Sequence, residues 1–187
     1  MANPLTDLVL SDPTWLRVLS FIGDPGVVCQ LGCISRRWYR LSRDATLWRR
    51  VNFTERRRLS LKKLAMFIRR PLAIHMHSLR VEGFIMSNSH SSAKRLTVSP
   101  ALLKELEERC PLLTELHLVN AKMDNIALDQ FPERLTSLNF VGSVLSFDFL
   151  ASLTNANILP RLTAIDLSYV HNLSSFSKSL DGLLSRT

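Results

Sequence analysis

Glycine is scarce in this sequence, with only six in 187 residues. Folds that turn tightly and often, such as small β-barrels, need glycine where the backbone must adopt positive φ angles. Leucine is by contrast abundant, at 34 residues. We therefore expect a helical or repeat-rich protein and not a glycine-turned barrel.

Cysteine is also rare and shows no pairing pattern. Cys29, Cys33 and Cys110 are odd in number and include no Cys-x-x-Cys spacing, which indicates reduced thiols in an intracellular protein. Cys29 and Cys33 could share one helix face and bind a metal, but no nearby His or third Cys supports this. We expect these thiols to pack as small apolar groups, and we expect no metal and no cofactor.

Long hydrophobic runs are missing. No stretch approaches the roughly 20 apolar residues that span a bilayer. Residues 1–16 also lack the basic and apolar regions of a signal peptide. We expect a cytoplasmic or nuclear protein, or one in both compartments, without a membrane partner.

Catalytic motifs are lacking as well. The sequence contains no phosphate-binding glycine loop, nucleophile elbow or His-Glu-x-x-His. Ser91 and Lys94 form a Ser-x-x-Lys without its companion motifs. His75 and His77 form a pair without a third metal ligand. We expect a protein with no catalytic residues.

The charge is concentrated in one half of the chain. The net charge of +8 is the sum of +11 in residues 1–98 and −3 in residues 99–187. Residues 36–70, named the basic band below, hold 13 Arg or Lys. This density suits nucleic acid, a nuclear import receptor or an acidic protein surface, or it is a solvated helix surface. No aromatic platform or nucleic-acid fold accompanies the band, which disfavours nucleic acid.

Three helices are predicted near the N-terminus. Asp12-Pro13 and Asp24-Pro25 are start signals, because Asp caps free amides and Pro fits the first turn. Gly23 should end the first helix, and Asp44 should begin the third. The first predicted helix runs through Trp15 to Ile22, the second runs from Asp24 to about Ser42, and the third is short and contains Leu47 and Trp48.

Four separated pieces of this region resemble an F-box. In order, they are Leu10-Ser11, Val18-Leu19-Ser20-Phe21-Ile22, Ile34-Ser35-Arg36-Arg37-Trp38 and Asp44-Ala45-Thr46-Leu47-Trp48. Ser11, Val27 and Ser35 depart from the usual Pro, acidic residue and Cys. The resemblance implies a three-helix F-box domain in residues 1–54. It also implies docking on a Skp-type adaptor and, through it, on a cullin scaffold.

The same resemblance implies an adaptor-binding surface made of apolar side chains. The residues expected to contact the adaptor, or to support that contact, are Leu10, Leu16, Leu19, Ile22, Leu31, Ile34, Trp38, Leu47 and Trp48. The basic band would complement the acidic surface of such an adaptor.

An internal repeat fills the rest of the chain. The pattern apolar-x-x-apolar-x-apolar begins at Met76, Leu113, Leu135 and Leu162, at intervals of 37, 22 and 27 residues. Leucine-rich repeats run roughly 20–29 residues, so the first interval holds an insertion, placed at the polar residues 87–95. Helix-like segments follow Ser99 and Ser146, between the predicted strands. This part resembles the leucine-rich repeats that follow some F-boxes.

The predicted fold is therefore α/β, with an F-box followed by a short repeat solenoid. We expect residues 55–74 to be a basic helical linker packed on the repeats. Residues 75–187 should form about four parallel strands on a concave face, with helices outside and no C-terminal cap. The ninth repeat position holds Phe84, Ala121, Ser143 and Val170, where Asn or Cys is usual. Less side-chain support for the turns is expected.

The repeat geometry designates a binding surface. Side chains that alternate with the buried strand positions should point to the concave face, where repeat proteins bind partners. The expected substrate-binding residues are Arg80, Glu82, Glu115, His117, Asn139 and Asp166.

These features predict a substrate-recognition subunit of a Skp–cullin–F-box ubiquitin ligase. It would present an unknown target protein for ubiquitination and proteasomal degradation, by proximity and without chemistry of its own. The alternative is a non-degradative repeat scaffold, or a truncated competitor that occupies the adaptor without presenting substrate. Nucleic-acid binding through the basic band is a third hypothesis.

Overall fold

The N-terminal part of the chain is a cluster of short helices. The computed structural model describes residues 10–54, 59–83, 97–123, 126–153 and 158–171. The first elements are α1 (Asp12–Leu19), α2 (Pro25–Leu31), α3 (Arg36–Leu41) and the 3-10 turn η1 (Ala45–Trp48). Each begins at a side chain that accepts a hydrogen bond from a free backbone amide: Ser11, Asp24, Ser35 and Asp44.

Two details of these helices differ from the sequence-based expectation. Ser11, and not Asp12, caps α1, and Asp12 instead pairs with Arg37. The single helix predicted over residues 24–42 is in fact α2 and α3. The chain breaks there because Ser35 is extended, with φ −159°, and its hydroxyl accepts from the Trp38 amide. Helix α1 also ends at Leu19, four residues before Gly23.

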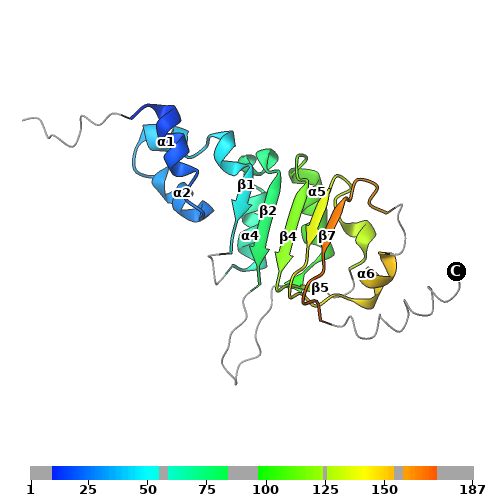
Figure 1. Cartoon of the computed structure of the whole chain (residues 1–187). Helices are drawn as coiled ribbons and strands as arrows, with labels where there is room; N and C mark the ends of the chain where they lie inside the picture. Colours follow the sequence, from blue (N-terminus) through cyan, green and yellow to red (C-terminus); the bar gives the residue numbers. More distant parts are fainter. Residues whose placement is uncertain (1–9, 55–58, 84–96, 124–125, 154–157, 172–187) are drawn as a thin grey trace, which may run out of the picture.

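A parallel sheet occupies the middle of the molecule (Figure 1). Its strand order is β1-β2-β4-β6-β7, and every neighbouring pair is parallel. The strands are β1 (Arg50–Asn52), β2 (Ser78–Glu82), β4 (Glu115–Val119), β6 (Ser137–Asn139) and β7 (Ala164–Asp166). The sheet thus has five strands where about four were expected. The extra strand, β1, lies at the end of the predicted F-box domain. Directly after it, the Phe53 amide donates to the Arg80 carbonyl at 2.8 Å and continues the ladder.

Helices cover one face of this sheet. They are α4 (Leu61–Ile68), α5 (Pro100–Arg109) and α6 (Phe147–Ser152), with the 3-10 turns η2 (Pro71–His75) and η3 (Leu128–Gln130). Ser99 and Ser146 cap α5 and α6 as predicted. Strands β3 (Thr97–Val98) and β5 (Lys122–Met123) form a small second sheet. Figure 1 shows α1 and α2 beyond the β1 end of the large sheet.

The apolar residues of the predicted repeats form the core between sheet and helices. The first three repeats bury their strand residues almost completely: Leu79, Val81, Leu116, Leu118, Leu138 and Phe140 are at most 1% exposed. The fourth repeat differs, because Ile165 on β7 is 38% exposed. Strand β7 is the edge of the sheet within the described residues, so its side chains have neighbours on one side only.

A threonine ladder fixes the register at the start of the strands. The Thr114, Thr136 and Thr163 hydroxyls donate to His77, Thr114 and Thr136 carbonyls at 3.2, 3.1 and 3.0 Å. The amide of each threonine donates to the same carbonyl. Each repeat is thereby tied to the preceding one at one equivalent position.

A second repeated feature lies where the strands end. The eighth residue of the last three repeats has a positive φ: Asn120 at 53°, Gly142 at 67° and Tyr169 at 57°. The next residue of the third repeat is Ser143, which is fully buried. Its hydroxyl donates to the Leu118 carbonyl at 2.7 Å and accepts from the Ala121 amide at 3.0 Å. The side-chain support that was expected to be missing is therefore present at Ser143.

Several sequence-based expectations fall outside the described residues. These are the insertion at 87–95, the ninth-position Phe84, residues 56–58 of the basic band, and the C-terminal segment with its cap. In the described part, none of the helices has the length and apolar character that crossing a bilayer requires. The described side chains also include no group of three or more potential metal ligands.

Candidate functional site

The helices of the predicted F-box are held together by an ion pair and by two indole rings in edge-to-face contact. The Arg37 guanidinium donates to Asp12 Oδ1 at 2.8 Å and to the Leu10 carbonyl at 2.7 Å. The Trp15 and Trp38 rings meet edge to face, with centroids 4.8 Å apart. These contacts connect α3 to the start and the middle of α1.

Exposed apolar side chains are concentrated on these helices. Of ten large apolar residues exposed in the described part of the chain, half lie between residues 18 and 39. They are Val18 (44%), Phe21 (74%), Val27 (38%), Ile34 (64%) and Tyr39 (47%). Soluble proteins keep such groups uncovered mainly where another molecule binds, so this segment is a candidate docking surface. We name these five residues the exposed apolar set.

The predicted adaptor-binding residues fall into three classes of exposure. Leu19 and Trp48 are buried, each 2% exposed, so they can only support a contact from beneath. Ile34 is exposed. Six are partly buried: Leu10, Leu16, Ile22, Leu31, Trp38 and Leu47.

Sequence reasoning missed four members of the exposed apolar set. Val18, Phe21, Val27 and Tyr39 were not among the contacts that the F-box resemblance implied. Apolar periodicity alone does not separate these four residues from buried ones, since exposure depends on how the short helices pack.

The basic band is mostly a solvent-exposed surface, and part of it has internal partners. Arg37 binds Asp12, and the Arg43 guanidinium lies 4.1 Å from the Tyr39 ring centroid. Arg69 of the segment after α4 pairs with Glu105 of α5, which raises the pKa of Arg69 and lowers that of Glu105. The remaining described cations, including Arg36, Arg40, Lys62 and Lys63, are exposed.

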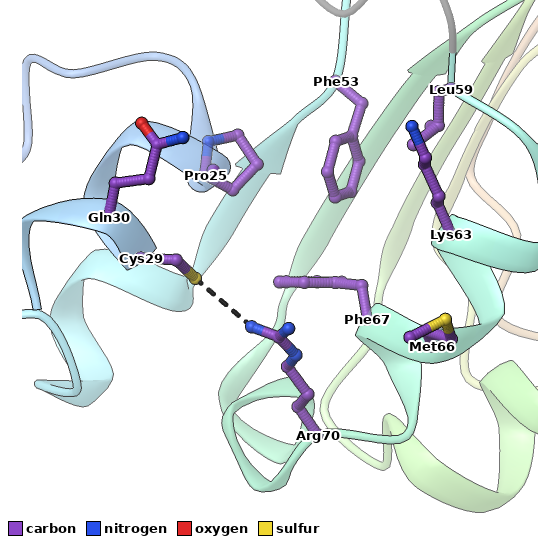
Figure 2. A pocket seen from close by; sticks show the side chains of 10 residues that line it. Pro25, Cys29, Gln30, Phe53, Leu59, Lys63, Met66, Phe67 and Arg70 are labelled. Atoms are coloured by element: carbon purple, nitrogen blue, oxygen red, sulfur yellow. Dashed lines mark hydrogen bonds between the residues drawn. The ribbon is translucent and has the colours of Figure 1, made fainter. Parts of the chain in front are cut away.

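A pocket lies between α2 and α4, where the first helices meet the sheet (Figure 2). Its aromatic wall is Phe53 and Phe67, whose rings meet edge to face at 5.2 Å. Arg70 closes another side and donates to Cys29 Sγ at 3.5 Å. The pocket lies at the joint between the helical cluster and the sheet.

The three cysteines lie in different environments. Cys110 is 3% exposed, and burial raises the pKa of its thiol to about 12. Cys29 is half-buried at the pocket. Cys33 is exposed, so the expectation that all three pack in the core is wrong for this residue.

The face of the sheet opposite the helices carries the predicted substrate-binding residues. We name it the open face. Along β2 and β4, buried residues alternate with half-buried or exposed ones, and the second kind includes Arg80, Glu82, Glu115 and His117. Asn139 and Asp166 continue the same face on β6 and β7. The structure thus brings all six predicted residues onto one face.

Five residues of the open face form a straight line across the strands. The pairing register places Asn52, Arg80, His117, Asn139 and Asp166 side by side, one from each strand. Asn139 Nδ2 donates to Asp166 Oδ2 at 2.9 Å. We name this line the cross-strand row.

The charges of the cross-strand row are set by its neighbours. Burial and the Arg80 guanidinium hold the pKa of His117 below its ordinary value, against the opposing effects of Glu115 and Asp166. Hydrogen bonds from Ser168 and then from Asn139 lower the pKa of Asp166. At neutral pH the row therefore carries a cation at Arg80, an anion at Asp166 and a neutral imidazole between them.

Comparison with known proteins agrees with both parts of the structure. Residues 12–54 match the family described as F-box-like. The chain is 30% identical over 161 residues to F-box/LRR-repeat protein 12 of Homo sapiens, covering 86% of this chain and 48% of that protein. It is also 30% identical over 166 residues to the Mus musculus protein of the same name, covering 89% and 48%.

The similarity extends well beyond the F-box, since it covers most of the described sheet as well. The chain spans about half the length of these relatives. The F-box match and the similarity through the repeats confirm the resemblance found in the sequence, and together they support an F-box and leucine-rich-repeat family for this chain.

Proposed function

We propose that this chain is a substrate-recognition subunit of a Skp–cullin–F-box ubiquitin ligase. In this role the helices α1–α3 dock on a Skp-type adaptor, and the repeats hold a target protein. The observation that carries the proposal is the exposed apolar set on a segment that matches an F-box.

The exposure of this set supports a protein partner. Phe21 and Ile34 are 74% and 64% exposed, which is unusual for large apolar side chains that do not bind another surface. Aromatic and aliphatic anchors of this kind carry most of the energy of typical interfaces. The exposed cations of the basic band would complement an acidic adaptor and accelerate association.

The sheet and its helices support the second half of the proposal. We infer an irregular leucine-rich-repeat array, because strands alternate with helices or 3-10 turns and each repeat begins at an equivalent hydrogen bond. Such arrays bind proteins on the face that the strands line. The role of the chain would be to hold two proteins close together and not to perform chemistry.

The test is capture of the purified chain by a purified Skp-type adaptor. The variant is Phe21→Ser with Ile34→Ser, which removes two exposed anchors and leaves the core unchanged. We expect the affinity to fall at least about tenfold, since hot-spot residues are worth upward of about 1–2 kcal/mol each.

The matched control is Met66→Ser with Leu112→Ser. Both residues are large, apolar and about half exposed, and neither belongs to the exposed apolar set. Met66 lies on α4, across the pocket from α2, and Leu112 lies after α5. This control should bind like the wild type. Equal affinity for all three proteins would contradict the proposal. Truncation of Trp38 is less informative, because its ring packs on Trp15 and its loss would also damage the fold.

A further inference from the structure

The open face combines opposite charges at a fixed separation. Arg80 and Asp166 are the charged members of the cross-strand row, on β2 and β7. Arg80 is exposed, and no ion pair to it is found among the described residues. Arg50 on β1, which pairs with Ser78 in the adjacent row, adds a second cation at the same end of the face.

The strand register gives the distance between the two charges. Three strand-to-strand steps separate Arg80 from Asp166 along β2-β4-β6-β7, and each step is about 4.8 Å, so the two residues are about 14 Å apart across the sheet. An extended peptide advances about 3.3 Å per residue, so about four steps cover this distance and the two end positions are residues i and i+4. Because four is even, the two side chains at the ends of that span project from the same side of the peptide.

The middle of the row suits uncharged polar groups. The pKa of His117 is lowered, which keeps its imidazole neutral, and Asn139 carries an uncharged amide, so neither presents a net charge there. The adjacent row consists of Arg50, Ser78, Glu115, Ser137 and Ala164. Its small side chains on β2, β6 and β7 leave room there for a peptide backbone beside the cross-strand row. Two further carboxylates lie on the face: Glu82 on β2, two residues from Arg80, and Glu115 on the central strand β4.

The geometry points to the class of target that the open face takes: an extended peptide segment with an acidic and a basic side chain four residues apart. The acidic side chain would meet Arg80 and the basic one Asp166, with a small polar residue midway opposite His117 and Asn139. This inference rests on the proposed function, since it names the substrate class of the same repeats. It does not depend on whether the F-box binds its adaptor.

The experiment is a titration of the isotope-labelled full chain with synthetic capped peptides, followed by NMR because weak binding is expected. The test peptide has Glu and Arg four residues apart with Ser midway. Three further peptides carry Glu at both positions, Arg at both, or Glu and Arg side by side. We expect the test peptide to bind at least about fivefold tighter than each of the others, with shifts on β2, β4, β6 and β7 that weaken with added salt.

A charge reversal makes the result specific. Arg80→Glu should abolish the preference for the mixed peptide and favour the peptide with two Arg. Lys62→Glu on α4 reverses an exposed charge on another element and should change nothing. Equal binding of all four peptides, shifts confined to the helices, or an unchanged preference in Arg80→Glu would each overturn the inference.

Adaptor capture is measured on the same proteins to separate the two proposals. Arg80→Glu should retain adaptor binding, and the Phe21→Ser and Ile34→Ser variant should retain the peptide preference. A wild-type chain that binds the adaptor but shows no peptide selectivity would therefore refute the inference alone. The converse result refutes only the docking proposal.

Discussion

At the scale of single residues, the most demanding positions are those that end the strands. Asn120, Gly142 and Tyr169 occupy equivalent places and share a positive φ. Asparagine and glycine tolerate this conformation, whereas a tyrosine there costs about 1–2 kcal/mol. The turn is thus imposed by the repeat geometry, even where the side chain disfavours it.

Two substitutions at these turns should have opposite effects. Gly142→Ala would bring a Cβ to 2.2 Å from Asn120 Oδ1 at a φ of +67°, so we expect it to destabilise the chain by at least about 2 kcal/mol. Tyr169→Gly removes the strain of a positive φ at a non-glycine residue, so it should stabilise the chain by about 0.5–1 kcal/mol. Urea unfolding followed by circular dichroism measures both. Changes of the same sign would contradict this account of the turn.

His117 should make the stability depend on pH. The pKa of His117 is lowered in the folded state by burial and by Arg80. Below pH 6.5, its ordinary pKa, the unfolded chain therefore binds more protons at this residue than the folded chain does. Stability should therefore fall as the pH drops through this range, and the loss should level off below the folded pKa.

The measurement is the free energy of unfolding between about pH 8 and pH 5 for wild type and His117→Gln, since the linkage slope comes from the titrating group. The variant should show a flatter profile as the pH falls through 6.5 toward the folded-state pKa of His117. The control is His171→Gln, at an exposed position. Identical profiles for wild type and His117→Gln would rule out this contribution.

At the scale of elements, polar caps and bridges decide where the chain turns. Ser35 divides one apolar stripe into α2 and α3, because its hydroxyl competes successfully for the Trp38 amide. Ser143 does the equivalent for the turn after β4, by bridging the Leu118 carbonyl and the Ala121 amide. Hydrophobic periodicity contains no information on either position.

Ser143→Ala should show how much the hydroxyl bridge contributes to the free energy of unfolding. It would leave the buried Ala121 amide without its hydroxyl acceptor, so we expect a loss of about 2 kcal/mol. The control is Ser137→Ala on the open face, a half-buried serine, which should change stability by less than about 0.5 kcal/mol. Denaturant unfolding compares the two. Similar effects would mean that the bridge contributes little.

At the scale of the whole molecule, the F-box helices and the sheet share one core. Val28 and Trp48 belong to the same buried cluster as the strand residues Leu79 and Leu116. The Trp48 ring lies 5.7 Å from that of Phe67 on α4, which in turn contacts Phe53. A small helical unit that is marginal by itself therefore gains stability from the repeats.

This shared core predicts a single cooperative transition. All three tryptophans lie in residues 15–48, so their fluorescence reports on the F-box helices, while circular dichroism reports on the whole chain. Phe67→Ala should lower both unfolding midpoints together, at a cost of about 3–5 kcal/mol. Met66→Ala, at an exposed neighbouring position, should shift neither. Separate transitions for the two probes would show that the units unfold independently.

Much of this protein could be read from its sequence. The spacing of Leu113, Leu116 and Leu118, and of their counterparts from Leu135, predicted the parallel strands and their buried faces, because strand periodicity leaves only one side for the core. The same alternation placed Arg80, His117 and Asp166 on one face. The F-box motifs likewise indicated the family, since they depend on local order and spacing.

Other features were decided only by tertiary structure. Strand β1 forms because β2 offers an edge to pair with, and three residues such as Arg50–Asn52 carry too little pattern to predict a strand. Leu19 and Trp48 are buried while Phe21 is exposed, although all are apolar residues of the same helical region. The cross-strand row required the register between distant segments. Local sequence determines which face of an element is apolar, whereas the packing of elements determines which apolar and charged groups remain on the surface to bind.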